Sequence, residues 1–389
     1  MSNRTAAPPR LPLRALLPLA LAAFVTVLTE ALPAGVLPAM SAGLGVGESA
    51  TGQLVTVYAV GTAVSAIPLV TATAAWRRKR LLLTSMAGFA VANTITAVSA
   101  AYPLTLVARF VAGIAAGVVW ALLAGYARRL VPAHLAGRAV AVVMAGLPVA
   151  LSTGIPAGTF LGHLAGWRAA FWAVTALAVL LVAAIVVFVP DQPGAPAGRL
   201  EPRAALRRPG VPAVLVTTLV FVLAQTVFYT YVATYLGEVG LGDSVDVVLL
   251  VYGVASLVGI WYVGAHVDRR LRGLTVAGTV LVAVAAAALA VPTDSHVLVY
   301  AAITLWGLGW GGIPALLQTA VADAAGDEAD SAQAMLVTLW NVAMAGGGAL
   351  GGLLLDAAGA RSFPWAMLVL LVPVLAVVLT SRGFPRPVR

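Results

Sequence analysis

The chain has 389 residues, of which 61% are hydrophobic and only 10% are charged, and its formal net charge is +9. One soluble core cannot bury so much apolar surface, so the composition excludes an ordinary water-soluble protein and indicates a chain whose solvent is lipid. Because the chain has no cysteine, disulfides, thiol chemistry and cysteine metal ligands are excluded as well.

Charge-free runs separated by Pro, Gly or charged residues predict twelve membrane-spanning helices, because a bilayer core about 30 Å thick needs roughly 20 apolar residues per helix. In chain order we expect them at 14–39, 51–74, 81–98, 103–126, 138–162, 168–189, 211–236, 246–266, 273–291, 297–320, 331–355 and 363–381. Eleven further runs follow the first, so we expect it to be retained as a helix and not removed as a signal peptide.

The second half of the chain repeats the first. Gly113 recurs as Gly307, 194 positions later, and neighbouring glycines recur at almost the same offset. Two homologous membrane halves are the usual build of a secondary transporter, in which one half rocks against the other. We therefore predict an all-α integral membrane protein with two pseudo-symmetric six-helix bundles at 1–189 and 211–389, joined by a Pro- and Gly-rich linker at 190–210.

Positive charge gathers in alternate loops. Of the 23 Lys and Arg residues, 20 lie in the N-terminus, the linker, the tail and the loops after the second, fourth and eighth predicted helices. This asymmetry is the positive-inside signal, and with an even number of helices it places both termini and the linker in the cytoplasm. Because 22 of these residues are Arg and one is Lys, the codon bias suggests a GC-rich bacterium, and we expect the inner membrane.

Nothing in the sequence indicates an enzyme or a nucleic-acid-binding protein. Loops other than the linker are short, and the Gly-x-x-x-x-Gly-Lys phosphate loop of ATP-hydrolysing proteins is absent. The four histidines lie near predicted span ends or in loops, without a carboxylate cluster at metal-ligand spacing. We expect no cofactor and no metal, and the basic residues mark membrane topology instead of a nucleic-acid surface.

Several short motifs occur in a fixed order along the predicted helices. They are Thr29-Glu30-Ala-Leu-Pro33-Ala-Gly35-Val-Leu-Pro38 in the first, Arg109-x-x-x-Gly113 in the fourth, Gly146 with Gly154-Ile-Pro156-Ala-Gly158 in the fifth, and Gly264-x-x-x-Asp268-Arg269 after the eighth. In this arrangement the whole chain resembles the major facilitator superfamily, in particular the drug:proton antiporters similar to arabinose, purine-nucleoside and chloramphenicol efflux permeases. The resemblance implies a monomer, and it implies that the element Gly146, Gly154, Pro156 and Gly158 lies at the interface of the halves and limits leak.

The loop after the second helix departs from this family pattern. Gly264 and Asp268 correspond to Val70 and Ala74, so only a basic cluster remains there. We expect a cytoplasmic gate made by Arg77, Arg78, Arg80, Gly264, Asp268 and Arg269. Acidic residues after the tenth helix are candidate partners for the arginines: Asp323, Asp327, Glu328 and Asp330. The alternative is that these acids are solvated and that Asp330 or Ser331 caps the next helix.

Glu30 and Arg109 are the acidic and the basic residue that lie well inside a predicted span, where charge is costly. Both lie about 10 to 15 Å from the outer ends of their helices at 1.5 Å per residue, and the resembled fold places these helices beside the cavity. We expect direct or water-bridged pairing. Since a buried carboxyl favours its neutral form and a nearby guanidinium opposes this, separating the pair would move a proton. The alternative is a permanent ion pair that fixes the two helices.

Substrate contacts are expected from aromatic and amide side chains inside the spans, which suit planar or hydroxylated neutral solutes. Gln225 and Tyr229 share one helix face at i and i+4, as do Trp306 and Trp310. The full set is Tyr58, Trp120, Gln225, Tyr229, Trp306, Trp310, Trp340 and Asn341. For each aromatic the alternative is helix packing or an interfacial belt. We expect Asn93 to be structural.

These features predict proton-coupled efflux, by antiport, of a small organic molecule or drug. The alternatives are a sugar or nucleoside facilitator or symporter on the same fold, and a sensor on a transporter scaffold that transports nothing. The expected partners are the small-molecule substrate, protons and the lipid bilayer.

Overall fold

The computed structural model describes residues 11–73, 75–132, 135–194, 202–291, 295–381 and 383–384, apart from the side chains at 66–68, 70, 71, 268 and 330. Throughout these residues the secondary structure is helical, without a strand. Eleven helical segments are long and apolar enough to cross a membrane, and α3, with 25 residues, supplies a twelfth. The predicted all-α fold with twelve spans is therefore confirmed.

The first half begins with the helices α1 (Leu13–Gly35), α2 (Leu37–Leu44), α3 (Glu48–Ala72), α4 (Arg78–Val98) and α5 (Tyr102–Arg129). The fifth span is built from α6 (Ala136–Met144), α7 (Gly146–Val149), a π-helical turn (Ala150–Gly154) and α8 (Ile155–Ala165), and α9 (Trp167–Phe188) follows.

The second half comprises α11 (Val211–Tyr229), α12 (Val232–Glu238), α13 (Val245–Ala290), α14 (His296–Gly311), α15 (Ile313–Ala325), α16 (Ala329–Ala358) and α17 (Phe363–Thr380). Between the halves, the linker forms a short helix, α10 (Pro202–Arg207).

Two of the interrupted spans, the first and the tenth, resume at a helix whose first turn holds a proline. The first breaks at Val36, one residue before α2 begins, and the tenth breaks at Gly312, between α14 and α15. In both cases a proline, Pro38 or Pro314, occupies the first turn of the next helix. Because proline lacks the N–H that a continuous helix needs, the helix is interrupted just before it. By contrast, the eighth and ninth spans run together in α13, with a kink at Arg270.

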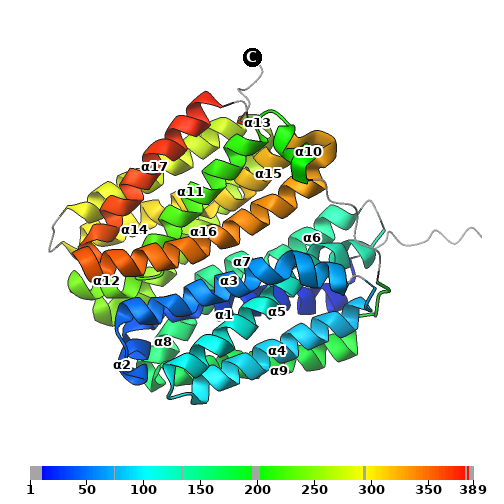
Figure 1. Ribbon diagram of the computed structural model, residues 1–389, viewed down its shortest axis with the longest axis horizontal. Coiled ribbons are helices and arrows are strands. Elements are labelled where there is room, and N and C mark those ends of the chain that lie inside the picture. The colour runs from blue at the N-terminus through cyan, green and yellow to red at the C-terminus, as the bar shows by residue number, and fades with distance from the viewer. Residues whose placement is uncertain are drawn as a thin grey trace, which may run out of the picture.

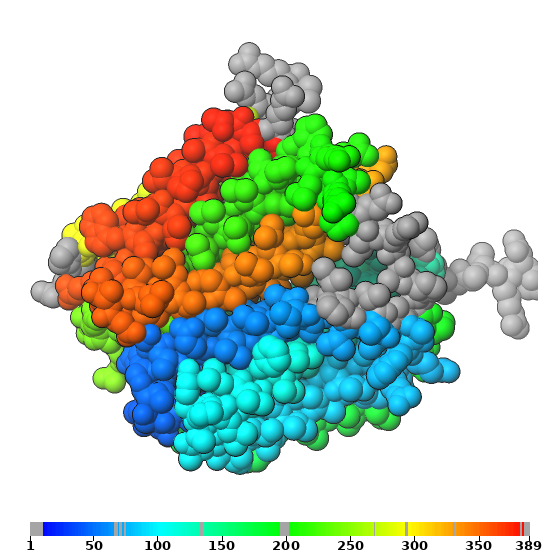
Figure 2. Space-filling model, in the orientation of Figure 1, coloured from blue at the N-terminus to red at the C-terminus, as the bar shows by residue number. Residues whose placement is uncertain are grey.

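The two halves lie side by side, and the axes of their helices are roughly aligned (Figure 1). We call the end that holds α10, the end of α5 and the start of α4 the linker end, and the end that holds α2 and α12 the far end. Figure 2 shows α16 lying against α3 along the seam between the halves. On the other side of the molecule α13 packs on α8 and the π-helical turn.

The outer surface is apolar. Large hydrophobic side chains are exposed on many helices, among them Leu164 at 74% and Val187 at 70%. Water would make such a surface unstable, whereas lipid solvates it and leaves all backbone polar groups to be satisfied within the helices. This surface is the one that a membrane protein requires.

Candidate functional site

Arg109 lies at the centre of a buried polar cluster in the first half. It is carried by α5, is fully buried, and donates hydrogen bonds to the main-chain oxygens of Thr29 (2.6 Å) and Glu30 (3.1 Å) on α1 and of Leu54 (3.4 Å) on α3. Its guanidinium also lies 4.7 Å from the ring centre of Tyr58. One side chain therefore joins three helices through main-chain acceptors.

The helix sequence explains why an acceptor is available on α1. In a regular helix the carbonyl of Thr29 would accept the N–H of the residue four positions later, which here is Pro33. Because proline has no N–H, the Thr29 oxygen is left without its helical donor, and Arg109 supplies one. The motif with Glu30 and Pro33 is thus a docking point for the arginine.

Arg109 contacts Glu30 through the main chain and not through an ion pair of the two side chains. Arg109 binds the main-chain oxygen of Glu30, and the pairs of opposite charge within 4.0 Å in the described part of the chain are three others, at Asp191, Asp327 and Glu238. Glu30 is half-buried and still interacts electrostatically with Arg109. A direct carboxylate pair is therefore not formed in this conformation, and the water-bridged form stays a prediction.

Two further side chains complete this cluster. The hydroxyl of Tyr58 donates to the main-chain oxygen of Thr26 (3.2 Å). Asn93, which we expected to be structural, donates from Nδ2 to the hydroxyl of Thr29 (3.1 Å), while its buried Oδ1 has no hydrogen-bond partner among the described residues. Trp120, the other cavity candidate of this half, is half-buried and packs on the hydrophobic core along α5.

A second polar and aromatic cluster lies in the other half. Oε1 of Gln225 accepts a hydrogen bond from Nε1 of Trp306 (2.6 Å), and Nε2 donates to the hydroxyl of Tyr252 (2.8 Å). The ring of Tyr229 lies 5.5 Å from that of Tyr252 and 6.2 Å from that of Trp306. The structure thus brings three predicted residues together, with the amide of Gln225 fixed at both ends.

Tyr252 is the member of this cluster that the sequence analysis missed. It stands 194 positions after Tyr58, so the internal repeat could have identified it. The packing repeats as well: a Cβ at Gly113 would overlap the main-chain oxygen of Tyr58, and a Cβ at Gly307 would overlap that of Tyr252. The two tyrosines are therefore equivalent positions in the two halves.

The remaining predicted cavity residues lie further along α14 and α16. Trp310 is 5.8 Å from Trp340 and 5.6 Å from Phe221, measured between ring centres. Asn341 is largely buried, and its Nδ2 donates to the main-chain oxygen of Val337 one turn earlier (2.9 Å). Trp310, Trp340 and Phe221 thus form an aromatic group that takes no part in the Gln225 hydrogen bonds.

The glycines of the fifth span face α1 of their own half. A Cβ at Gly146 would overlap the main-chain oxygen of Ala20, one at Gly154 would lie 2.7 Å from the ring of Phe24, and one at Gly158 would lie 2.7 Å from Leu32. Contact with the other half comes from the opposite side of the span, where Leu151 and Ser152 meet Gly253. The segment therefore lies between α1 and the other half, with its glycines turned toward α1, and its role in limiting leak stays a prediction.

Pro156 lies two residues after the end of the π-helical turn Ala150–Gly154. Since it cannot donate to the residue four positions before it, the wider turn is the local response of the helix. In this span the proline therefore coincides with a π-bulge.

At the linker end, one of the arginines that we expected in the cytoplasmic gate pairs with a residue that follows its own half. Arg77 forms an ion pair with Asp191, directly after α9. Although partial burial favours the neutral acid, the hydrogen bonds from Arg77 and the N–H of Lys79, with the charge of Arg77, hold the pKa of Asp191 below its ordinary value. Asp327 of the expected acidic partners is instead 3.9 Å from Arg208. The described ion pairs of Arg77 and Asp327 are thus made with other partners, and the gate itself stays a prediction.

Three other predicted gate residues make no described contact with the opposite half. Arg80 lies 5.6 Å from the ring centre of Trp76, Arg269 is exposed, and a Cβ at Gly264 would meet nothing within 4 Å. The side chains of Asp268 and Asp330 fall outside the described residues.

Hydrogen bonds join the two halves at the far end. The hydroxyl of Thr234 donates to the carboxylate of Glu48, the Tyr231 hydroxyl lies 3.3 Å from the main-chain oxygen of Ser49, and Gln53 donates to that of Gly348 (3.4 Å). Glycines provide the room, because a Cβ at Gly52, Gly351 or Gly352 would come within 3 Å of these side chains. The far end is therefore closed by direct contact of α3 with α12 and α16.

Comparison with known proteins agrees with this architecture. The family model described as Major Facilitator Superfamily matches residues 19–347. A chloramphenicol efflux pump of Mycobacterium tuberculosis is 32% identical over 388 residues, covering 95% of this chain and 92% of the pump. The purine ribonucleoside efflux pump NepI of Escherichia coli O6:K15:H31 is 29% identical over 360 residues, covering 92% and 90%. The crystal structure of a POT family transporter in complex with 5-aminolevulinic acid superposes with a TM-score of 0.77 at 12% identity, covering 96% and 97%. The chain therefore belongs to the Major Facilitator Superfamily.

Proposed function

We propose that this protein exports a small organic molecule across the bacterial inner membrane in exchange for protons, by alternating access of a site between its two halves. The substrate class that fits best is a neutral, planar or hydroxylated solute such as a phenicol or a nucleoside. The similarity to pumps named for chloramphenicol and for purine ribonucleosides, at about 30% identity, supports export of this kind.

The observation that carries the proton role is the arrangement around Glu30. The donors of Arg109 are engaged by three main-chain oxygens, so the nearby carboxyl of Glu30 is not fixed in an ion pair within 4.0 Å. A carboxyl inside a span that interacts with a fixed positive charge but remains free to protonate is suited to proton exchange. Movement of α1 relative to α5 would alter that interaction.

The Gln225 cluster supplies the substrate chemistry. The Gln225 amide, the Trp306 N–H and the Tyr252 hydroxyl can exchange their mutual hydrogen bonds for bonds to a solute hydroxyl, amide or ring nitrogen. The surrounding aromatic rings offer stacking surfaces. Among the described contacts of the two clusters, Glu30 is the one carboxylate, and it lies near Arg109. A neutral solute therefore fits better than a multiply charged one.

The proposed orientation places the linker end in the cytoplasm, because the basic residues gather there. With the far end closed by the contacts around Tyr231, the conformation described here is then the one closed to the outside.

Proton movement across liposomes that contain the purified protein tests the proposal. A pH gradient is imposed, and phenicols, nucleosides, pentoses and cationic dyes are added in turn to wild type, Glu30→Gln and the control Glu328→Gln, whose carboxyl lies outside the spans. We expect a phenicol or nucleoside to trigger proton flux in wild type and in Glu328→Gln, and Glu30→Gln to reduce that flux to background.

Solute flux that is independent of protons in all three proteins would replace antiport by facilitated diffusion. Proton flux that survives unchanged in Glu30→Gln would remove the role of this residue. If none of the added solutes produced proton or solute flux in any of the three proteins, a sensor that transports nothing would be favoured.

A further inference from the structure

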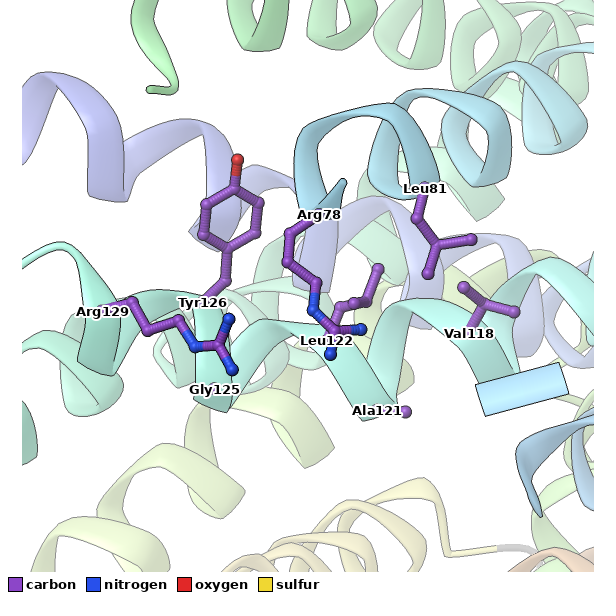
Figure 3. Close-up of a pocket in the computed structure, with 8 residues that line it drawn as sticks. All are labelled: Arg78, Leu81, Val118, Ala121, Leu122, Gly125, Tyr126 and Arg129. Carbon is purple, nitrogen blue, oxygen red and sulfur yellow. The ribbon is translucent and has the colours of Figure 1, made fainter. Parts of the chain in front are cut away.

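A hollow of about 100 Å³ lies between α4 and α5 at the linker end and takes no part in the proposed transport site (Figure 3). Arg78 and Arg129 extend over it from the two helices, as Figure 3 shows. Its floor is apolar and is formed mainly by Leu81, Val118, Leu122 and Gly125. Positive side chains thus stand above a groove without charge.

The position of the groove on α5 shows which way it opens. Gly125 lies 18 residues after Val107, and at 3.6 residues per turn this is five full turns, so both lie on one helix face. Val107 and its neighbour Val111 on this face are 61% and 42% exposed. Large apolar side chains that are exposed on a membrane helix face lipid. The groove therefore opens toward the bilayer.

Its depth matches the boundary between membrane and water. Arg78 is the first residue of α4 and Arg129 is the last residue of α5. The two guanidinium charges lie close enough to interact unfavourably. The adjacent carboxylate, Asp191, is engaged by Arg77 and by the N–H of Lys79, and Arg129 donates one hydrogen bond to the uncharged main-chain oxygen of Pro193 (2.8 Å). An anion between the two arginines would relieve their repulsion.

We propose that this groove binds an anionic phospholipid, with the headgroup phosphate between Arg78 and Arg129 and the upper part of an acyl chain along Val118, Leu122 and Gly125. Guanidinium groups bind phosphate oxygens through paired, charge-assisted hydrogen bonds. A free phosphate would use only the rim, whereas a lipid uses both the charged rim and the apolar floor. The inference is independent of which solute the protein transports.

Two variants separate the headgroup from the acyl chain. Arg129→Gln removes one charge, and its matched control is Arg128→Gln, the adjacent exposed arginine that is absent from the lining of the groove. Gly125→Leu fills the floor, and since a Cβ at this position would meet nothing within 4 Å, the helix itself accommodates it. Gly137→Leu, at an equally open position on α6, is its control.

The test is the binding of phosphatidylglycerol to the detergent-purified protein, measured by native mass spectrometry and by the thermal midpoint, with phosphatidylcholine and inorganic phosphate as comparisons. We expect phosphatidylglycerol to bind and to stabilise wild type more than phosphatidylcholine does. Arg129→Gln should weaken that binding roughly fivefold, Gly125→Leu should also weaken it, and both controls should behave as wild type.

Equal binding of the two lipids would overturn the proposal, as would an equal loss in Arg128→Gln. Stabilisation by inorganic phosphate that matches phosphatidylglycerol and is unaffected by Gly125→Leu would show a free-anion site instead. Thermal midpoints without lipid establish that each variant is folded before binding is compared.

Discussion

Arg109 owes its position to main-chain oxygens and not to a carboxylate. The guanidinium fork reaches acceptors on two helices at once, and the best of these, the Thr29 oxygen at 2.6 Å, is available because Pro33 provides no N–H. A second buried polar group, Asn93, binds the hydroxyl of the same threonine. At the scale of single residues, the first half is thus organised around one arginine and one interrupted helical hydrogen bond.

We expect Arg109→Lys to destabilise the protein although it preserves the charge. An ammonium is a point donor and cannot reach acceptors on α1 and α3 as a planar fork does. Each buried carbonyl that loses its donor costs about 1–3 kcal/mol. The thermal unfolding midpoint in a fixed detergent measures the effect, with Arg138→Lys at an exposed position of α6 as control. Equal midpoints for the two variants would contradict the anchoring role of the fork.

At the scale of elements, the fifth span has two distinct faces. Its glycines admit α1 to close range, while the side with Ser152 meets Gly253 of the other half. Close packing through small residues replaces the hydrophobic effect, which cannot drive association between helices in lipid. The span is therefore fixed to its own half by one face and is left with the other for contact across the interface.

Gly146→Ala tests this packing with a single methyl group. Its Cβ would overlap the main-chain oxygen of Ala20, so α1 and α7 must separate, and overpacking of this kind costs typically about 1–3 kcal/mol. We expect a lower thermal midpoint, whereas Gly137→Ala, which meets nothing within 4 Å, should be neutral or slightly stabilising because alanine favours helix. A Gly146→Ala midpoint equal to that of Gly137→Ala would show that the contact is not tight.

At the scale of the whole molecule, the contacts between the halves are unequal at the two ends. Far-end contacts include hydrogen bonds from Thr234, Tyr231 and Gln53 across the seam. At the linker end, the described ion pairs of Arg77 and Arg208 remain within one half or its linker. An opening movement of the far end therefore requires these hydrogen bonds to break.

Tyr231→Phe should make the far end open more often. The variant keeps the ring and removes the hydroxyl near Ser49 and Gly348, and a net loss of about 1 kcal/mol per hydrogen bond corresponds to a roughly fivefold larger open population. Because the chain has no cysteine, labelling of a single Thr56→Cys by a membrane-impermeant maleimide reports that opening. Tyr262→Phe, at an exposed position, is the control, and equal labelling rates would contradict the closing role of Tyr231.

Some properties of this protein could be predicted from local sequence. The twelve spans and their order follow from hydrophobic length, and the interrupted helices at Val36 and Gly312 follow from prolines that can be read directly. The repeat indicated two equivalent halves. It could also have predicted the role of Tyr252, because Tyr252 stands 194 positions after Tyr58. These features are determined by each segment's own chemistry or by its internal copy.

The tertiary structure decided which groups meet. Arg109 binds main-chain oxygens and not the Glu30 carboxylate, the glycines of the fifth span face α1, and Arg77 pairs with Asp191 and not with the acidic run after α15. Each outcome depends on the rotation and depth of one helix relative to another. Sequence spacing determines the face that a residue occupies on its own helix, but only packing determines the helix against which that face lies.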